Sequence, residues 1–223
     1  MHKEIFTTKK NIKDTTIALI SDIHFGKDSR TKEFSVPGED IFDETTGAVS
    51  LEQGLVDLLR ENKIEYLFIA GDLTSLGSPQ EYFYCEKKIL EIADKSNIAK
   101  ENIVCSLGNH DIDWLVYNLH KLQCKEKTLP NDVVKIIKDG YEKLSAFSPY
   151  VNLKDLGQYN PEVRTPNVYV KESSDFIVFV LNTSWDCNPD QKITSHGKLS
   201  SAQIEWFANV AEQYIDDTRY KIV

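Results

Sequence analysis

The chain has 223 residues, enough for one substantial domain with a packed core. Its composition, 41% apolar and 10% aromatic, is typical of a globular protein and excludes a chain that is disordered throughout. The formal net charge of −9 argues against binding a long polyanion or an acidic membrane surface by electrostatics alone.

Three short apolar runs in the first half of the chain have the pattern of strands that are buried on both faces. They are residues 17–20, 67–70 and 103–107. Capping boxes at 50–53 and 78–81 predict a helix between each pair of runs, and Pro79 stands at the first helical position of the second. This alternation predicts parallel strands with helical crossovers.

The second half of the chain predicts a hairpin and one more helix. Residues 168–170 and 176–181 have strand character and are separated by a charged turn, which is the pattern of a hairpin. A third capping box at 200–203 begins a helix with one apolar face. Residues 220–223 are apolar enough to open another buried strand.

Two long stretches lack the pattern of a packed core, namely residues 27–49 and 112–164. Loops of this length in compact domains are usually functional or disordered. We expect a single domain over residues 1–223, with residues 112–164 as a helical cap over the site.

Each of the three early strands ends in polar residues that can bind metals. Asp22 and His24 follow the first strand, Asp72 the second, and residues 108–111, Gly-Asn-His-Asp, the third. In open α/β sheets the ligand crevice lies beyond the carboxyl ends of the strands, so these groups should converge. Residues two apart in an extended stretch point the same way, which would let Asp22 and His24 reach one ion.

Glycines precede two of these groups. Gly71 stands directly before Asp72, and Gly108 directly before Asn109. Because glycine adopts backbone conformations that other residues avoid, we expect both to let the chain turn tightly before the ligands.

The ordered set D-x-H, G-D and G-N-H-D resembles the signature of the calcineurin-like metallophosphoesterases. Residues 197–200, together with Gln203 and Trp206, also look like the stretch before that family's fourth motif. The resemblance covers nearly the whole chain. It implies a layered α/β/β/α sandwich with mixed sheets, and phosphoester hydrolysis through a metal-bridging hydroxide.

The resemblance also implies a ligand for each metal. Asp22 and His24 would bind the first ion, Asp72 would bridge both ions, and Asn109 would bind the second. This mixture of carboxylate, imidazole and amide donors suits Mn²⁺, Fe or Zn²⁺. Two such ions held close together lower the pKa of a shared water and neutralise phosphoryl oxygens.

His110 is the catalytic residue that the resemblance implies, placed near the phosphate or the leaving oxygen and held by Asp111. For Asp111, capping of the following segment is an equally strong alternative. Asp113, Trp114, His120, Asp186 and His196 are better explained by helix initiation, a surface helix or solvated loops, although Asp113 and Trp114 could stand at the entrance of the site.

The family completes its site with a histidine just after the strand near Tyr220 and with a later Gly-His-x-His motif, and this chain ends before both. We therefore expect a truncated piece of a longer protein, with further domains after residue 223 and at most one tightly bound ion in the chain as given.

The leading hypothesis is a metallophosphoesterase acting on a phosphoester small molecule or nucleotide, with phosphodiesters slightly favoured because long inserts could narrow the cleft. The alternative is a non-catalytic or regulatory metal-binding scaffold, or a sensor module at the head of a larger protein. P-loop, G-x-S-x-G and H-E-x-x-H motifs are absent from the sequence.

The sequence also indicates where the protein is located and the state of its cysteines. The first residues lack the apolar core of a secretory signal, and no stretch is apolar enough to span a bilayer, so we expect a cytoplasmic protein without a membrane partner. The four cysteines contain no C-x-x-C pair, and buried free thiols are the simplest interpretation.

Overall fold

Three parallel strands form the sheet that carries the candidate site. A computed structural model describes residues 15–29, 31–38, 50–112, 159–163, 165–184 and 197–223. In it β1 (Ile17–Ile20), β2 (Tyr66–Ala70) and β3 (Ile103–Ser106) pair in that order. Because the strands are parallel and in register, their carboxyl ends meet at one edge of the sheet, as the sequence predicts.

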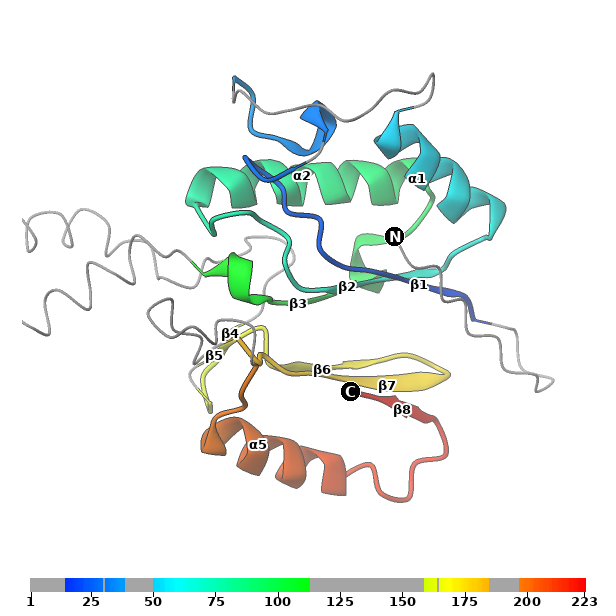
Figure 1. Cartoon of the computed structure of the whole chain (residues 1–223). Coiled ribbons are helices and arrows are strands. Elements are labelled where there is room, and N and C mark those ends of the chain that lie inside the picture. Colours follow the sequence, from blue (N-terminus) through cyan, green and yellow to red (C-terminus); the bar gives the residue numbers. More distant parts are fainter. Residues whose placement is uncertain (1–14, 30, 39–49, 113–158, 164, 185–196) are drawn as a thin grey trace, which may run out of the picture.

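Two helices cover one face of this sheet (Figure 1), α1 (Leu51–Glu61) and α2 (Pro79–Lys95). Their predicted starts are confirmed, because Ser50 and Ser78 each accept a hydrogen bond from the backbone N–H three residues on. Of these two serines, Ser78 alone belongs to a complete capping box, in which Glu81 bonds back to the cap. The helices and the sheet together form the first layers of the sandwich.

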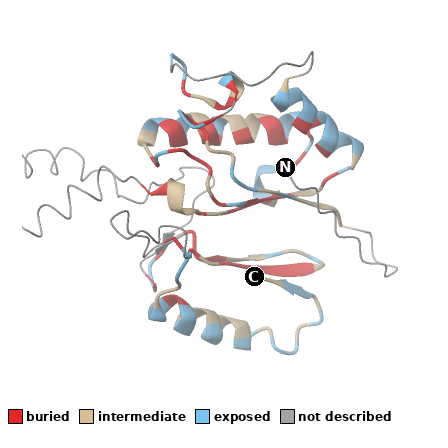
Figure 2. Cartoon of the chain, in the orientation of Figure 1, coloured by how far each residue is buried: buried red, intermediate tan, exposed pale blue. Residues whose placement is uncertain are grey.

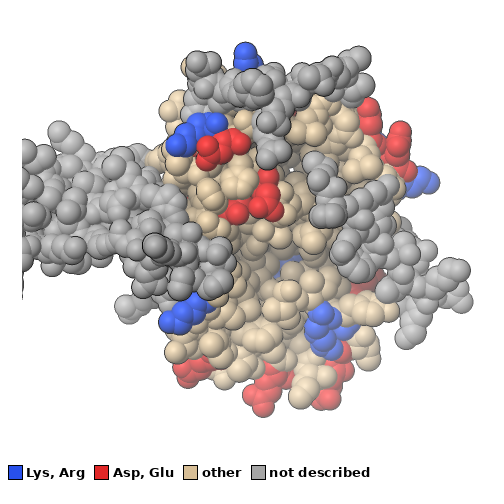
Figure 3. Space-filling view, viewed as in Figure 1, with Lys and Arg blue, Asp and Glu red and all other residues tan. Residues whose placement is uncertain are grey.

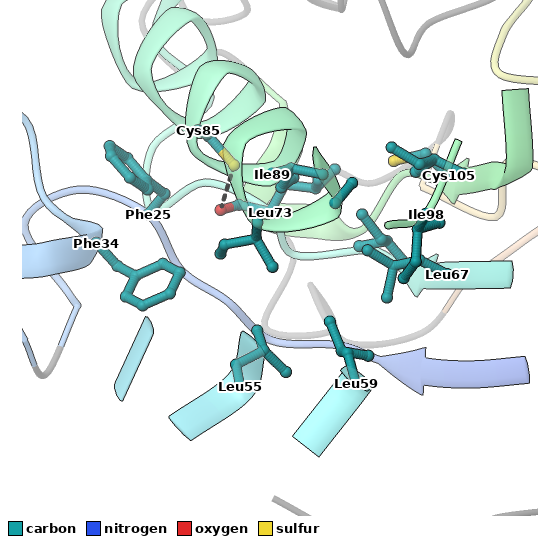
Figure 4. Close-up of a cluster of buried hydrophobic side chains, with 14 of the residues drawn as sticks. Phe25, Phe34, Leu55, Leu59, Leu67, Leu73, Cys85, Ile89, Ile98 and Cys105 are labelled. Atoms are coloured by element: carbon teal, nitrogen blue, oxygen red, sulfur yellow. Dashed lines mark hydrogen bonds between the residues drawn. The ribbon is translucent and has the colours of Figure 1, made fainter. Parts of the chain in front are cut away.

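The larger core lies between these helices and the sheet. Figure 4 shows Leu55 and Leu59 of α1 and Ile89 of α2 gathered with Leu67 of β2. Cys85 and Cys105 belong to the same cluster as buried free thiols, as expected from the sequence. Cys124 and Cys187 lie outside the described residues.

A second sheet packs on the opposite face of the first. Its strands are β6 (Tyr169–Glu172), β7 (Phe176–Val180) and β8 (Tyr220–Ile222), with β6 and β7 antiparallel and β7 and β8 parallel. Phe68 and Val104 of the first sheet meet Phe176 and Val178 of the second in a smaller core. The predicted hairpin and the mixed sheet are therefore confirmed.

Helix α5 (Ser201–Glu212) forms the outer layer over the second sheet (Figure 1). Phe179 of β7 stacks edge-on against Phe207 and Tyr214. The buried Gln203 side chain also accepts from the backbone N–H of Asn182 and donates to its carbonyl, both at 3.0 Å. The order helices, sheet, sheet, helix gives the expected α/β/β/α sandwich.

The short elements complete the described structure. Tyr159–Asn160 (β4) pairs with Thr165–Pro166 (β5), and single 3₁₀ turns occur at Lys32–Phe34 (η1), Lys100–Asn102 (η2) and Asn109–Asp111 (η3).

The cap predicted over 112–164 falls mainly on residues 113–158 and 164, which lie outside the described residues. None of the described helices combines the length and apolarity needed to cross a membrane.

Two strands are less buried than the sequence predicts. Figure 2 shows β7 buried along its whole length, whereas β1 and β8 are partly exposed. Leu19 of β1 is 50% exposed and Tyr220 of β8 is 53% exposed. Each of these strands has one neighbour among the described strands, but so does β3, which is largely buried, so what packs on the faces of a strand also decides its exposure. An apolar run shows strand character, but it does not show where the strand lies in its sheet.

Candidate metal centre

The chain segments that follow β1 and β2 stay paired beyond the ends of the strands. The N–H of His24 donates to the carbonyl of Asp72 at 2.9 Å, and that of Phe25 donates to the carbonyl of Leu73 at 2.7 Å. Phe25 and Thr74 form a further parallel bridge. This continued pairing brings the D-x-H segment alongside the G-D segment.

Three of the four predicted metal ligands come together at this edge. The ligand atoms of Asp22, His24 and Asp72 all lie within 4.8 Å of one another. Nε2 of His24 is 3.9 Å from Oδ1 of Asp22, which is too far for a hydrogen bond. The Asp22 side chain is 67% exposed, and its other oxygen accepts a 2.6 Å hydrogen bond from Ser21. The cluster therefore opens to solvent on the side of Asp22.

The backbone that presents these ligands is not extended. Asp22, His24 and Asp72 have φ angles of 56°, 47° and 50°, in the left-handed region. Asp22 and His24 do converge, but the predicted reason, the alternation of side chains along an extended strand, is wrong. Left-handed conformations at non-glycine residues cost about 1–3 kcal/mol each and persist where surrounding contacts impose them, often at functional sites.

Gly71 and Gly108 allow the ends of β2 and β3 to approach closely. A Cβ on Gly71 would lie 2.7 Å from the backbone nitrogen of Gly108, and one on Gly108 would lie 2.1 Å from Oδ1 of Asp72. Gly71 also has a φ of +81°, so the predicted turn role holds for it. Gly108 has a φ of −102° that any residue can adopt, and the space next to Asp72 is what requires glycine there.

His110 lies against this cluster and is held at two points. Its backbone N–H donates to Oδ1 of Asp72 at 2.9 Å, and its ring stands edge-on to that of His24 with centroids 4.5 Å apart. Nδ1 of His110 is 3.0 Å from the carbonyl oxygen of Ser75. Because a carbonyl only accepts, Nδ1 carries the hydrogen, and Nε2 is the nitrogen left for chemistry.

Asp111 holds the backbone of the site rather than the His110 ring. Its buried carboxylate accepts hydrogen bonds from the N–H groups of Gly108 at 2.8 Å and Thr74 at 2.9 Å, and from the Thr74 hydroxyl at 3.1 Å. Burial raises the pKa of Asp111 to about 6, although these backbone hydrogen bonds oppose the rise. The ring of His110 is thus fixed by Ser75, and Asp111 ties the end of β3 to the segment after β2.

Asn109 begins the turn η3, directly between Gly108 and His110, and is half-buried. Residues that flank the strands of the second sheet steady this end of β3, since Ser184 donates to the carbonyl of Leu107 and Asn167 to that of Cys105. Of the other residues considered in the sequence, Asp113, Trp114, His120, Asp186 and His196 lie outside the described residues.

Sequence reasoning missed the polar residues that follow Asp72. Thr74 and Ser75 are almost fully buried and contact three of the site residues, His24, His110 and Asp111. A polar pair between Leu73 and Leu76 was the available signal, but in a sequence it is indistinguishable from an ordinary turn.

Comparison with known proteins agrees with this geometry. The model of the family described as calcineurin-like phosphoesterase matches residues 15–219. No curated protein matches the chain.

Proposed function

Because the chain belongs to the calcineurin-like phosphoesterase family, we propose that it hydrolyses phosphate esters with divalent metal ions held at the ends of β1, β2 and β3. The observation that carries the proposal is the gathering of Asp22, His24 and Asp72 within 4.8 Å, with the His110 ring 4.5 Å from that of His24. A structural role alone does not explain why two carboxylates and two imidazoles meet at a solvent-accessible edge.

The donor set fits a divalent cation. Two carboxylates and one imidazole are the ligands that Mn²⁺, Fe and Zn²⁺ accept, and these are the ions that we propose. Among the described residues, neither Asp22 nor Asp72 forms an ion pair with lysine or arginine. Nδ1 of His24 is buried and has no hydrogen-bond partner there. Carboxylates without a basic partner, together with a buried ring nitrogen without a hydrogen-bond partner, favour a bound cation here.

For the individual residues we propose the roles that the family resemblance implies. Asp22 and His24 would hold the first ion, Asp72 would contribute to both, and Asn109 would serve the second. Bound divalent ions would lower the pKa of a water and neutralise the charge on the phosphoryl oxygens.

His110 would act on the phosphate or on the leaving oxygen through Nε2. Its Nδ1 is engaged by the Ser75 carbonyl, which leaves Nε2 as the nitrogen that can donate to or take a proton from the substrate. Asp111 would act as a positioning residue, because its contacts are to the backbone that presents Gly108 and Thr74.

For the substrate we propose a phosphodiester or nucleotide-like molecule. The support is the length of the two stretches at 27–49 and 112–164, each of which begins within a few residues of a site motif. We also propose that residues 112–164 form a cap over the site. Acidic and basic side chains of the described residues are scattered on the face in Figure 3, without a basic patch there for a long polyanion.

The test is a metal-dependent assay on the 223-residue protein. After chelator treatment, Mn²⁺, Zn²⁺ or Fe²⁺ is added back, and hydrolysis of bis(p-nitrophenyl) phosphate and p-nitrophenyl phosphate is compared. We expect metal-dependent turnover that is lost in Asp22→Asn and kept in Asp57→Asn, which removes an exposed carboxylate on α1. Metal binding without turnover would favour the scaffold or sensor alternative, and absence of metal binding would contradict both.

A further inference from the structure

Ser75 joins three parts of the site through its own hydrogen bonds. It lies three residues after Asp72 and is 1% exposed. Its carbonyl accepts from Nδ1 of His110 at 3.0 Å, and its hydroxyl donates to the carbonyl of His24 at 2.9 Å. The same hydroxyl accepts from the N–H of Asp28 at 3.0 Å, and the N–H of Ser75 donates to the carbonyl of Phe25 at 3.0 Å. A buried residue with this set of partners links a metal ligand to the catalytic histidine.

The carbonyl of Ser75 selects one tautomer of His110. Free neutral imidazole carries its hydrogen on either nitrogen, and a fixed acceptor at one nitrogen decides which of the two is protonated. The acceptor here is a backbone carbonyl, so the selection depends on where the main chain at Ser75 is held. A displaced carbonyl would leave the ring free to rotate or to change tautomer.

The hydroxyl of Ser75 holds that main chain against the D-x-H segment. His24 has a left-handed φ of 47°, which needs surrounding contacts to persist. The bond from the Ser75 hydroxyl ends on the carbonyl of His24 itself, and the Asp28 contact ties in the loop that follows. Removal of the hydroxyl would therefore loosen both the backbone of His24 and the Ser75 carbonyl that fixes the His110 ring.

We propose that Ser75 is a positioning residue that couples the backbone of the metal ligand His24 to the tautomer and orientation of the His110 ring. The expected effect of Ser75 on turnover rests on the proposed function. The expected effect on the His110 tautomer does not, and it can be measured in a protein without activity. Sequence resemblance assigned the holding of His110 to Asp111, whose carboxylate instead contacts Gly108 and Thr74.

The first measurement is the tautomer of His110, read from two-bond ¹H–¹⁵N spectra of the ¹⁵N-labelled protein, metal-free and with diamagnetic Zn²⁺. The signal is assigned by its loss in His110→Gln. We expect hydrogen on Nδ1 in the wild type and a shift toward the Nε2–H form in Ser75→Ala. The matched control is Ser29→Ala, which removes a buried hydroxyl in the same region whose partners belong to Thr31. It should leave the His110 signals unchanged.

The second measurement is steady-state kinetics on the diester with the same variants. At saturating metal, Ser75→Ala should lower kcat about 10- to 100-fold, the usual range for residues that orient a metal site, with KM nearly unchanged and metal affinity reduced. Ser75→Thr, which keeps a hydroxyl, should recover much of the loss, and Ser29→Ala should behave as the wild type.

A wild-type His110 with hydrogen on Nε2 would overturn the inference even if Ser75→Ala did not fold. A folded Ser75→Ala with the wild-type tautomer and turnover would overturn it as well. Failure of the proposed function looks different, because the wild type would then lack turnover while its His110 tautomer was still the one expected here.

Discussion

The backbone N–H of His110 donates a 2.9 Å hydrogen bond to Oδ1 of Asp72, so one contact joins the residue proposed for catalysis to the residue proposed to bridge the metals. The donor is a main-chain group, and a change of the His110 side chain leaves it in place. The acceptor is the carboxylate itself, so truncation of the Asp72 side chain would remove both a proposed metal ligand and this contact. The two residues should therefore fail in different ways.

For His110→Gln we expect turnover on phosphodiesters to fall about 10²–10⁴-fold, the usual contribution of a general acid or base. Metal content should stay close to that of the wild type, because the backbone contact to Asp72 does not involve the side chain. Turnover and elemental analysis are measured on the same sample. Wild-type rates on several phosphoesters would show that His110 has no part in the chemistry.

For Asp72→Asn we expect the loss of at least one bound ion and of turnover. The amide keeps the shape of the side chain but removes the charge that attracts the cation. Titration calorimetry with Mn²⁺ measures the change in affinity and stoichiometry. Asp94→Asn, an exposed carboxylate at the end of α2, is the control and should bind like the wild type. Equal Mn²⁺ binding by all three proteins would remove Asp72 from the site.

For Gly108→Ala we expect destabilisation by about 1–3 kcal/mol, the range for overpacking a close contact, together with weaker metal binding. The new methyl group would lie 2.1 Å from Oδ1 of Asp72, so the carboxylate must move. Urea unfolding of the metal-free protein measures the stability change, and Mn²⁺ titration measures the site.

The matched control for Gly108→Ala is Gly54→Ala. Gly54 lies inside α1, and a Cβ added to it would meet nothing within 4 Å, so alanine there should stabilise the protein by about 0.5–1 kcal/mol. A Gly108→Ala protein as stable as the wild type, with full metal affinity, would contradict the close approach of β3 to Asp72.

Asp111 should make the stability of the metal-free protein depend on pH. Burial raises its folded-state pKa from an ordinary 3.8 to about 6, so between these values the folded state binds more protons than the unfolded state. The contribution of Asp111 to the free energy of unfolding should therefore decrease as pH rises from about 4 to about 6, and level off above that.

The measurement is the difference in urea unfolding free energy between wild type and Asp111→Asn across this pH range. The variant lacks the titrating group, so the difference isolates it from other carboxylates. It also places an amide opposite the N–H of Gly108, which should cost about 1–3 kcal/mol at neutral pH. A pH-independent difference would show that Asp111 is not titrating in this window.

The helix starts and most strands could be predicted because their signals lie within a few residues. Ser50, Ser78 and Ser200 each accept from the N–H three residues on, so a local sequence contains both partners of the bond. The burial of β1 could not be predicted in this way. Leu19 is as apolar as its neighbours, and its exposure depends on what packs against it in the fold.

The sequence alone determined the family resemblance and three of the residues that gather at the site. Polar side chains at the carboxyl ends of parallel strands meet at one edge, and the strands and their parallel crossovers were readable from local patterns. Asp22, His24 and Asp72 do meet there. The identity of the candidate ligands was therefore a local property of the chain.

Only the tertiary structure decided how these residues are held. The left-handed backbone at Asp22 and His24, the close approach of Gly108 to Asp72, and the choice of Ser75 rather than Asp111 as partner of the His110 ring all depend on contacts between segments far apart in the sequence. Such contacts form where two chain segments happen to lie within hydrogen-bond distance. A one-dimensional pattern of residue types carries no record of that distance.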